Sequence, residues 1–266
     1  MGTSKLKFAL LAIATGLALV WISSATAVPV YVHSGANDPT TEGWTLSQSA
    51  GATGALEGGS ETIGAVSHDF WRVQDSSTTD SQAYLRNLTA GDLSGNWRLE
   101  GVLRIVDSPI VPGHAVGGTS IIVSDGLNYW SFYFGNASAG PISNTGKSGP
   151  HTYVWATPVA TQVDYHRYVI QFSQNGAGTA DDTADFYVDG ALVFDNQGRS
   201  GLWTSAEEFV YFGPNGTTGM SDANYELVRF DANLTSASVP LPGSFGLLVA
   251  GVFACAGIRR SRLNRG

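Results

Sequence analysis

Four aspartates lie close together in the sequence, around one expected hairpin: Asp181, Asp182, Asp185 and Asp189. Carboxylate oxygens are the ligands that Ca²⁺ prefers, and calcium loops gather several of them from one flexible segment. The spacing matches neither an EF-hand loop nor the calcium-binding repeats of parallel β-helices. Two interpretations stand: a calcium site, and an acidic loop that is solvated and binds nothing.

A second set of residues has the composition of a carbohydrate site: Asp125, Asn128, Tyr129 and Tyr133. Sugar sites combine an aromatic ring with a few polar groups that hydrogen-bond the ligand. The alternative is that the two tyrosines only cover one face of a sheet, because aromatic residues here follow the period of a strand. Two interpretations therefore stand for this set: a covering role alone, and ligand binding.

The sequence contains few of the residue patterns that are typical of enzymes. Glycoside hydrolysis needs two carboxylates, about 5 Å apart in retaining enzymes and further apart in inverting ones. Glu57 and Glu61 flank a Gly-Gly-Ser segment that we expect to be too flexible to hold them, and Glu207 and Glu208 are adjacent, so that on a strand they face opposite ways. The histidines are scattered, and the sequence has no zinc-protease, nucleophile-elbow or phosphate-loop motif. We predict no catalytic residue; two carboxylates that converge from distant positions are the alternative.

We expect the segments that hold these candidate residues to be β-strands. Short runs with period-two alternation are separated by turn signals such as Asp125-Gly126 and Asp189-Gly190, and no long amphipathic helix is found. The expected strands are 30–32, 97–106, 118–123, 128–134, 165–172, 184–188, 191–194, 209–212 and 225–231. The segment 46–67 is rich in small residues and is predicted as loop with at most one strand. This pattern predicts an all-β, two-sheet antiparallel sandwich.

Alternation also predicts which side chains form the core. In 128–134 the side chains of Trp130, Phe132 and Phe134 share one face, and Tyr129 and Tyr133 lie on the other. We expect the first three in the core.

The net charge of the chain excludes some classes of binding partner. Residues 28–238 hold 8 Lys and Arg and 22 Asp and Glu, a formal net charge of −14. A body this acidic repels nucleic acid and anionic lipid. The single cysteine, Cys255, lies outside this body, which therefore holds no disulfide.

The two ends of the chain have targeting features. Lys5 and Lys7 precede an apolar run over 8–22, and Ala25 and Ala27 form a small-x-small cleavage site. This predicts a signal peptide, 1–27, that signal peptidase removes, with an uncleaved anchor as the alternative.

After a β-sandwich domain over 28–234 and a linker, 235–238, the tail 239–266 holds a Pro-containing motif, an apolar helix over 243–258 and an arginine cluster over 259–265. The residues of the motif and cluster are Val239, Pro240, Leu241, Pro242, Arg259, Arg260 and Arg262. The prolines favour an extended strip, and the arginines hold the C-terminus on the cytoplasmic side of a membrane.

Residues 165–194, YHRYVIQFSQNGAGTADDTADFYVDGALVF, carry a first resemblance. The strand that begins Tyr-His and the Tyr-Val-Asp-Gly hairpin resemble the laminin G-like, concanavalin A-like jelly-roll superfamily. The resemblance implies a jelly-roll sandwich and, in many members, calcium at a sheet edge. Lectins, glycosidases and adhesion modules share this fold, so it names no ligand. Its glucanases carry Glu-x-Asp-x-x-Glu on one strand, a pattern absent here.

The tail carries a second resemblance. The VPLP motif, the apolar run and the arginine cluster resemble the PEP-CTERM sorting signals of Gram-negative bacteria that make exopolysaccharide, in the variant that reads VPLPA; Gly243 stands where that variant has Ala. The resemblance implies an inner-membrane intermediate, cleavage by an exosortase-type transpeptidase, and release to the cell surface or matrix. The alternative is a permanent anchor. Together these observations predict an exported, non-catalytic protein that binds extracellular polysaccharide, with a glycan-degrading enzyme and a purely structural or adhesion protein as alternatives.

Overall fold

The computed structural model describes residues 31–77, 79–109, 118–143, 152–153, 159–174, 183–198, 201–202, 207–214 and 220–234. The predicted signal peptide and sorting tail lie outside these ranges, with Ala25, Ala27, Val239, Pro240, Leu241, Pro242, Arg259, Arg260 and Arg262. Asp181 and Asp182 also lie outside them. Within the described ranges, no helix has the length and apolar character needed to span a membrane.

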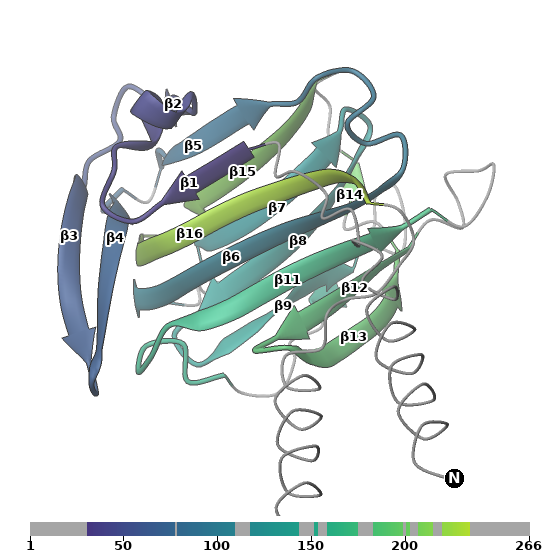
Figure 1. Cartoon of the computed structure of the whole chain (residues 1–266). Helices are drawn as coiled ribbons and strands as arrows, with labels where there is room; N and C mark the ends of the chain where they lie inside the picture. Colours follow the sequence, from purple (N-terminus) through teal and green to yellow (C-terminus); the bar gives the residue numbers. More distant parts are fainter. Residues whose placement is uncertain are drawn as a thin grey trace, which may run out of the picture.

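The described strands form two antiparallel sheets that pack face to face (Figure 1). The front sheet has the order β13-β12-β11-β6-β16-β4-β3, with β1 beside β16. Its strands are β1 (Tyr31–Ser34), β3 (Leu56–Ile63), β4 (Val66–Asp75), β6 (Asn96–Asp107), β11 (His166–Ser173), β12 (Thr183–Val188), β13 (Ala191–Gln197) and β16 (Ser221–Leu234).

The back sheet has the order β10-β9-β8-β7-β15-β5-β2, with β14 beside β8. Its strands are β2 (Thr45–Gln48), β5 (Gln82–Asn87), β7 (Thr119–Asp125), β8 (Asn128–Gly135), β9 (Ser138–Ser143), β10 (Thr152–Tyr153), β14 (Gly201–Leu202) and β15 (Glu208–Pro214). A short 3-10 turn, Pro39–Glu42, connects β1 to β2. The predicted all-β, two-sheet antiparallel sandwich is confirmed.

Alternation along the strands builds the core between the sheets. Trp97 and Leu99 of β6 and Phe132 and Phe134 of β8 are buried in one cluster that joins both sheets, and Trp130 belongs to it. The prediction for 128–134 is therefore confirmed. Burying aromatic side chains of this size is the main stabilising contribution to such a core.

One part of the sequence-based prediction is wrong. The segment 46–67, predicted as loop with at most one strand, contains the end of β2, all of β3 and the start of β4. Two of its glycines, Gly58 and Gly59, lie in the β3–β4 ladder, where their neighbours leave no room for a side chain. A Cβ on Gly58 would lie 2.3 Å from the backbone oxygen of Ala36, and one on Gly59 would lie 2.7 Å from Cζ of Phe70. Glycine here reflects close packing and not flexibility.

The predicted Asp-Gly hairpin is confirmed. Asp189 and Gly190 connect β12 to β13, with φ angles of 51° and 82°. Positive φ at both central positions is the signature of a tight hairpin turn whose twist suits the flanking strands.

Candidate functional site

The described aspartates of the predicted calcium site do not come together. Asp185 lies within β12, where its Oδ1 accepts a hydrogen bond from the Asn196 backbone N–H at 2.9 Å. Asp189 lies in the following turn, where Oδ1 accepts from the Arg167 N–H at 2.9 Å and Oδ2 is 2.7 Å from Nδ1 of His166. Among the residues that the structure describes, no three His, Cys, Asp or Glu side chains form a group that could hold a metal. With Asp181 and Asp182 outside those residues, the calcium site stays a prediction.

The predicted carbohydrate set lies on the back sheet. The Asp125 carboxylate closes the β7–β8 turn, because Oδ1 accepts from the Leu127 N–H at 2.8 Å and Oδ2 accepts from the Asn128 side chain at 3.0 Å. Tyr129 and Tyr133 are only 8% and 5% exposed. Tyr129 packs in a small apolar cluster on the outer side of the back sheet. Ligand binding by these residues stays a prediction.

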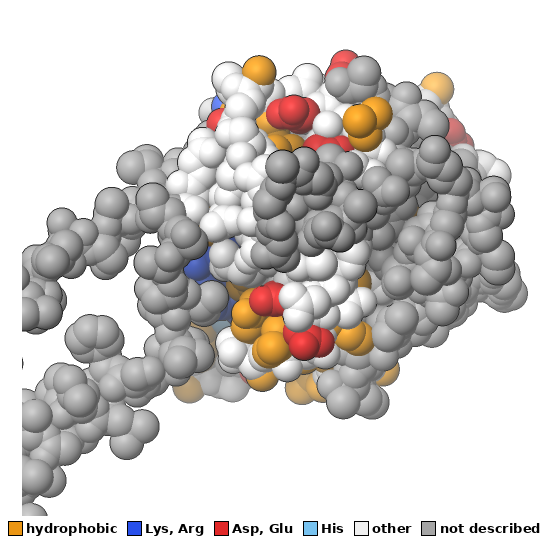
Figure 2. All heavy atoms as spheres, turned by 90° about the vertical axis from the view of Figure 1, so that its right-hand side faces the viewer, with side chains coloured by type: hydrophobic (Ala, Val, Ile, Leu, Met, Phe, Trp, Pro, Cys, Tyr) orange, Lys and Arg blue, Asp and Glu red, His pale blue; other side chains and the backbone are white. Residues whose placement is uncertain are grey.

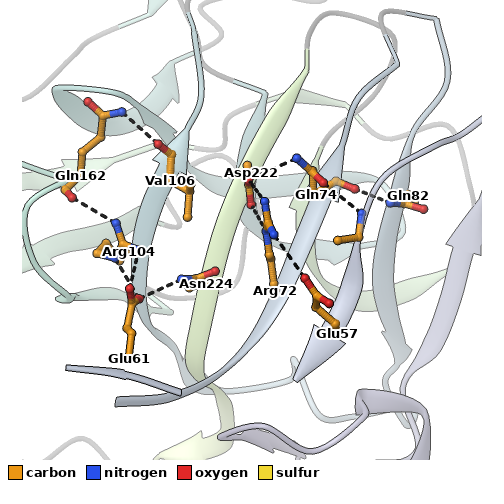
Figure 3. A network of polar contacts seen from close by, with 11 residues as sticks. Glu57, Glu61, Arg72, Gln74, Gln82, Arg104, Val106, Gln162, Asp222 and Asn224 are labelled. Atoms are coloured by element: carbon orange, nitrogen blue, oxygen red, sulfur yellow. Dashed lines mark hydrogen bonds and ion pairs between the residues drawn. The ribbon is translucent and has the colours of Figure 1, made fainter. Parts of the chain in front are cut away.

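The outer face of the front sheet carries a polar constellation that the sequence did not single out. Its centre is Glu61 on β3. Arg104 of β6 donates to both carboxylate oxygens, at 3.0 and 2.7 Å. The Tyr165 hydroxyl, just before β11, donates at 2.7 Å, and the Asn224 amide on β16 donates at 2.8 Å. Figure 3 shows the Glu61, Arg104 and Asn224 side chains pointing toward one another from three strands.

These contacts require a strongly curved sheet. In the strand order, β3 is three positions from β6, so Glu61 and Arg104 would lie about 14 Å apart on a flat sheet with ordinary spacing. Contact at 2.7 Å therefore means that the β3–β4 hairpin curls over the outer face. Figure 1 shows the same curl: β3 and β4 run steeply at the left, whereas β16 and β6 cross the centre. The β3–β4 hairpin is therefore bent toward the outer face at this end.

An aromatic pair lies beside Glu61. The rings of His68 and Tyr165 stack with centroids 4.1 Å apart and an interplanar angle of 11°. Nδ1 of His68 is 2.6 Å from a Glu226 carboxylate oxygen, which fixes the orientation of the imidazole. This group is called the Glu61 cluster: Glu61, His68, Arg104, Tyr165, Asn224 and Glu226.

Hydrogen bonding fixes the charge states in the Glu61 cluster. Burial alone would raise the pKa of the Glu61 carboxyl, but the bonds from Arg104, Tyr165 and Asn224 outweigh it, so the pKa lies below its usual value. Burial raises the pKa of the Tyr165 phenol, and its bond to the carboxylate raises it further. Glu61 is therefore an anion and Tyr165 a neutral hydroxyl at neutral pH.

A second polar group lies further along the same face of β6. Arg167 donates to both oxygens of Glu100, at 2.6 and 3.1 Å. Arg98 and Arg229 both contact Asp231, each at 2.9 Å. We call these five residues the Glu100 cluster. Its carboxylates lie beneath its guanidinium groups: the Asp231 side chain is 1% exposed and that of Arg229 is 32% exposed.

The structure corrects the expectation for Glu57 and Glu61. Both lie on a paired strand, and both are bound to arginine: Glu57 contacts Arg72 at 3.2 Å, and Arg72 also forms two bonds to Asp222 (Figure 3). One pattern in the sequence could have predicted the charged outer face of the front sheet. In β6, Arg98, Glu100 and Arg104 alternate with apolar residues, which places them on one side of the strand.

Similarity to known proteins is found in the fold and not in the sequence. No protein-family model matches the chain, and neither does any curated protein sequence. Among solved structures, a carbohydrate esterase from the Shiga toxin-encoding bacteriophage phi24B aligns over 78% of this chain and 100% of its own, with a TM-score of 0.53 and 10% identity.

Two further structures align less closely. The Crh5 transglycosylase, in complex with NAG, covers 77% of this chain and 85% of its own, at TM-score 0.47 and 14% identity. An endo-β-1,4-glucuronan lyase from the fungus Trichoderma reesei covers 77% and 96%, at TM-score 0.45 and 12% identity. At such identities a likeness concerns the fold alone. With its sheet topology and the esterase alignment, the described chain is a jelly-roll β-sandwich of the concanavalin A-like kind.

Proposed function

We propose that this chain is an exported, non-catalytic protein that binds extracellular polysaccharide on the outer face of its front sheet. Signal peptidase removes 1–27, and an exosortase-type enzyme processes the tail 239–266 after transient membrane contact. The protein then resides at the cell surface or in the matrix. The sorting part of the proposal comes from the sequence motifs alone.

The observation that carries the proposal is the Glu61 cluster. Sugars offer hydroxyl groups that both donate and accept hydrogen bonds, and apolar ring faces that pack on aromatic rings. The cluster offers both partners: N–H donors from Arg104 and carboxylate acceptors from Glu61 lie beside a stacked His68–Tyr165 pair. Because the sheet curls here, polar and aromatic groups from separate strands converge on one region of the outer face, as they do in ligand sites.

The charge states favour binding over hydrolysis. A glycosidase needs one carboxyl that stays protonated, with a raised pKa, to protonate the leaving group. The pKa of Glu61 is lowered, and its carboxylate is already engaged by three side chains. It is therefore a hydrogen-bond acceptor and not an acid catalyst.

One observation favours the runner-up, a glycan-degrading enzyme. Asp125 and Glu208 are direct cross-strand partners on β7 and β15, which places their side chains about 5 Å apart on one face. Burial raises the pKa of Glu208, and the charges of Asp125 and Asp92 raise it further. Two carboxyls at this separation, one of them with a raised pKa, are what a retaining glycosidase uses. Against it, both Asp125 oxygens are occupied in the turn.

A polysaccharide screen tests the proposal. The purified full-length protein is titrated with a panel of soluble polysaccharides, and released reducing sugar is measured in parallel. We expect saturable binding without sugar release, weakened about fivefold by Tyr165→Ala, because stacking on an aromatic ring contributes on the order of 1 kcal/mol. The control is Leu127→Ala, an exposed side chain in the β7–β8 turn.

Each other outcome selects a different function. Sugar release that Glu208→Gln abolishes would make the protein an enzyme. Absence of both binding and release would leave a structural or adhesion protein. Binding that is unchanged in Tyr165→Ala would place the ligand elsewhere on the molecule.

A further inference from the structure

We infer that the ligand of this face is a neutral, hydroxyl-rich polysaccharide chain that lies along β6 and spans both polar clusters, and that acidic polysaccharides are excluded; this rests on the proposed function.

The cationic side chains of the body are concentrated on this face. Six of the eight Lys and Arg residues in 28–238 are among the described residues, and five of these six lie on the outer face of the front sheet: Arg72, Arg98, Arg104, Arg167 and Arg229. Figure 2 agrees, since basic side chains appear only toward its left, the side on which the front sheet lies, while acidic ones are spread over the face in view.

Each of these arginines is matched by carboxylate. Arg104 is paired with Glu61. Arg72 is paired with both Asp222 and Glu57, so that site has an excess of negative charge. None of the five is therefore an uncompensated cation.

The Glu100 cluster is balanced as well. It has three arginines and two carboxylates, and the nearby charge of Asp189 acts on Arg167 as a third. A uronate or sulfate group would have to displace one of these carboxylates, or bind beside it in a body with a net charge of −14. Both costs are absent for a neutral sugar.

A paired guanidinium still recognises hydroxyl groups. It has five N–H donors, and a bidentate contact with a carboxylate uses two of them. In the Glu100 cluster, Arg167 and Arg229 are 36% and 32% exposed above their buried partners. Donors held in place by ion pairs lose little freedom when a ligand binds, so they suit weak, uncharged hydrogen-bonding groups.

The spacing of the clusters sets the size of the ligand. Arg98 and Arg104 point to the same side of β6 and are six residues apart, which is about 20 Å along a strand. Val102 lies between them on that face. One sugar ring is too short to contact both clusters, so a chain of several units is required to use the whole face.

The experiment compares neutral and acidic glycans on the purified full-length protein. Cello-, xylo- and malto-oligosaccharides of increasing length, with dextran and mannan, are the neutral probes; oligogalacturonates, alginate and hyaluronate are the acidic ones. We expect binding only to neutral chains, affinity that rises with length to a plateau, and a Kd that changes less than about twofold between low and high salt.

Two variants test the spanning geometry. We expect Arg229→Gln to lower the affinity for long oligosaccharides about fivefold, which corresponds to the free energy of one ordinary hydrogen bond. The affinity for short oligosaccharides stays unchanged. Asn87→Ala, an exposed residue of the back sheet, changes neither. Circular dichroism confirms that both variants are folded.

The outcomes separate this inference from the proposed function. Binding to acidic glycans that falls steeply with salt overturns the inference and leaves carbohydrate binding intact. Affinity that is independent of chain length overturns the spanning geometry. If no glycan of either kind binds, the proposed function fails, and the inference fails with it.

Discussion

Replacing Glu61 by alanine tests the structural account of the curled face. The side chain is 24% exposed and accepts bonds from Arg104, Tyr165 and Asn224. Its loss leaves the Arg104 guanidinium, 17% exposed, with the Gln162 carbonyl at 3.3 Å as its remaining partner. Bonds to charged groups contribute about 1.5–3 kcal/mol each when buried, and breaking a fully buried ion pair costs about 3–5 kcal/mol. Partial exposure reduces these values, so we expect a loss of about 2–3 kcal/mol.

Urea and thermal unfolding, followed by circular dichroism, measure this loss. For a domain of this size it lowers Tm by roughly 5–10 °C. Glu57→Ala is the matched control on the same strand: its side chain is 60% exposed and has one bond, to Arg72. We expect less than about 0.5 kcal/mol for the control. Equal effects of the two substitutions would refute the reasoning, because they would mean that the Glu61 contacts do not hold the hairpin in its curled position.

Three further predictions follow from individual residues. Gly58→Ala destabilises the protein by about 1–3 kcal/mol, because its Cβ would lie 2.3 Å from the Ala36 oxygen; denaturation that matches the wild type would contradict the packing of β3. Because the pKa of Glu61 is lowered in the folded protein, the stabilising contribution of its carboxylate is complete above the ordinary pKa of 4.5 and is lost as the pH falls through the folded-state pKa. Glu61→Gln should therefore lose less stability than the wild type on acidification. Parallel curves of stability against pH for the two proteins would contradict this role of Glu61. If Asp185 and Asp189 act only through their hydrogen bonds to Asn196 and Arg167, chelation of calcium leaves Tm unchanged; a drop in Tm that added calcium reverses would support the predicted calcium site.

Much of the fold could be predicted from local patterns. Alternation of apolar and polar residues was sufficient for β6 and β11, because each buries one face in the core between the sheets. The turn at Asp189-Gly190 was predictable from two residues, since few sequences adopt positive φ at adjacent positions. These features depend on neighbours in sequence.

The β3 strand and the Glu61 cluster could not be predicted in the same way. Gly58 and Gly59 weaken the strand signal, and the reason for them is contact with Ala36 and Phe70, which only the folded chain brings near. The bonds of Glu61 link it to Tyr165 and Asn224, 104 and 163 positions away in the chain. Such a site depends on the curvature of the sheet, and no local pattern specifies curvature.

The most direct test of the central claim is to locate a bound neutral oligosaccharide by amide chemical-shift mapping on isotopically labelled protein. We expect the largest changes in β6, between Arg98 and Arg104, and at Tyr165 and Asn224. Changes confined to β8, around Tyr129 and Tyr133, would contradict it, and would move the site to the back sheet, where the sequence first indicated one.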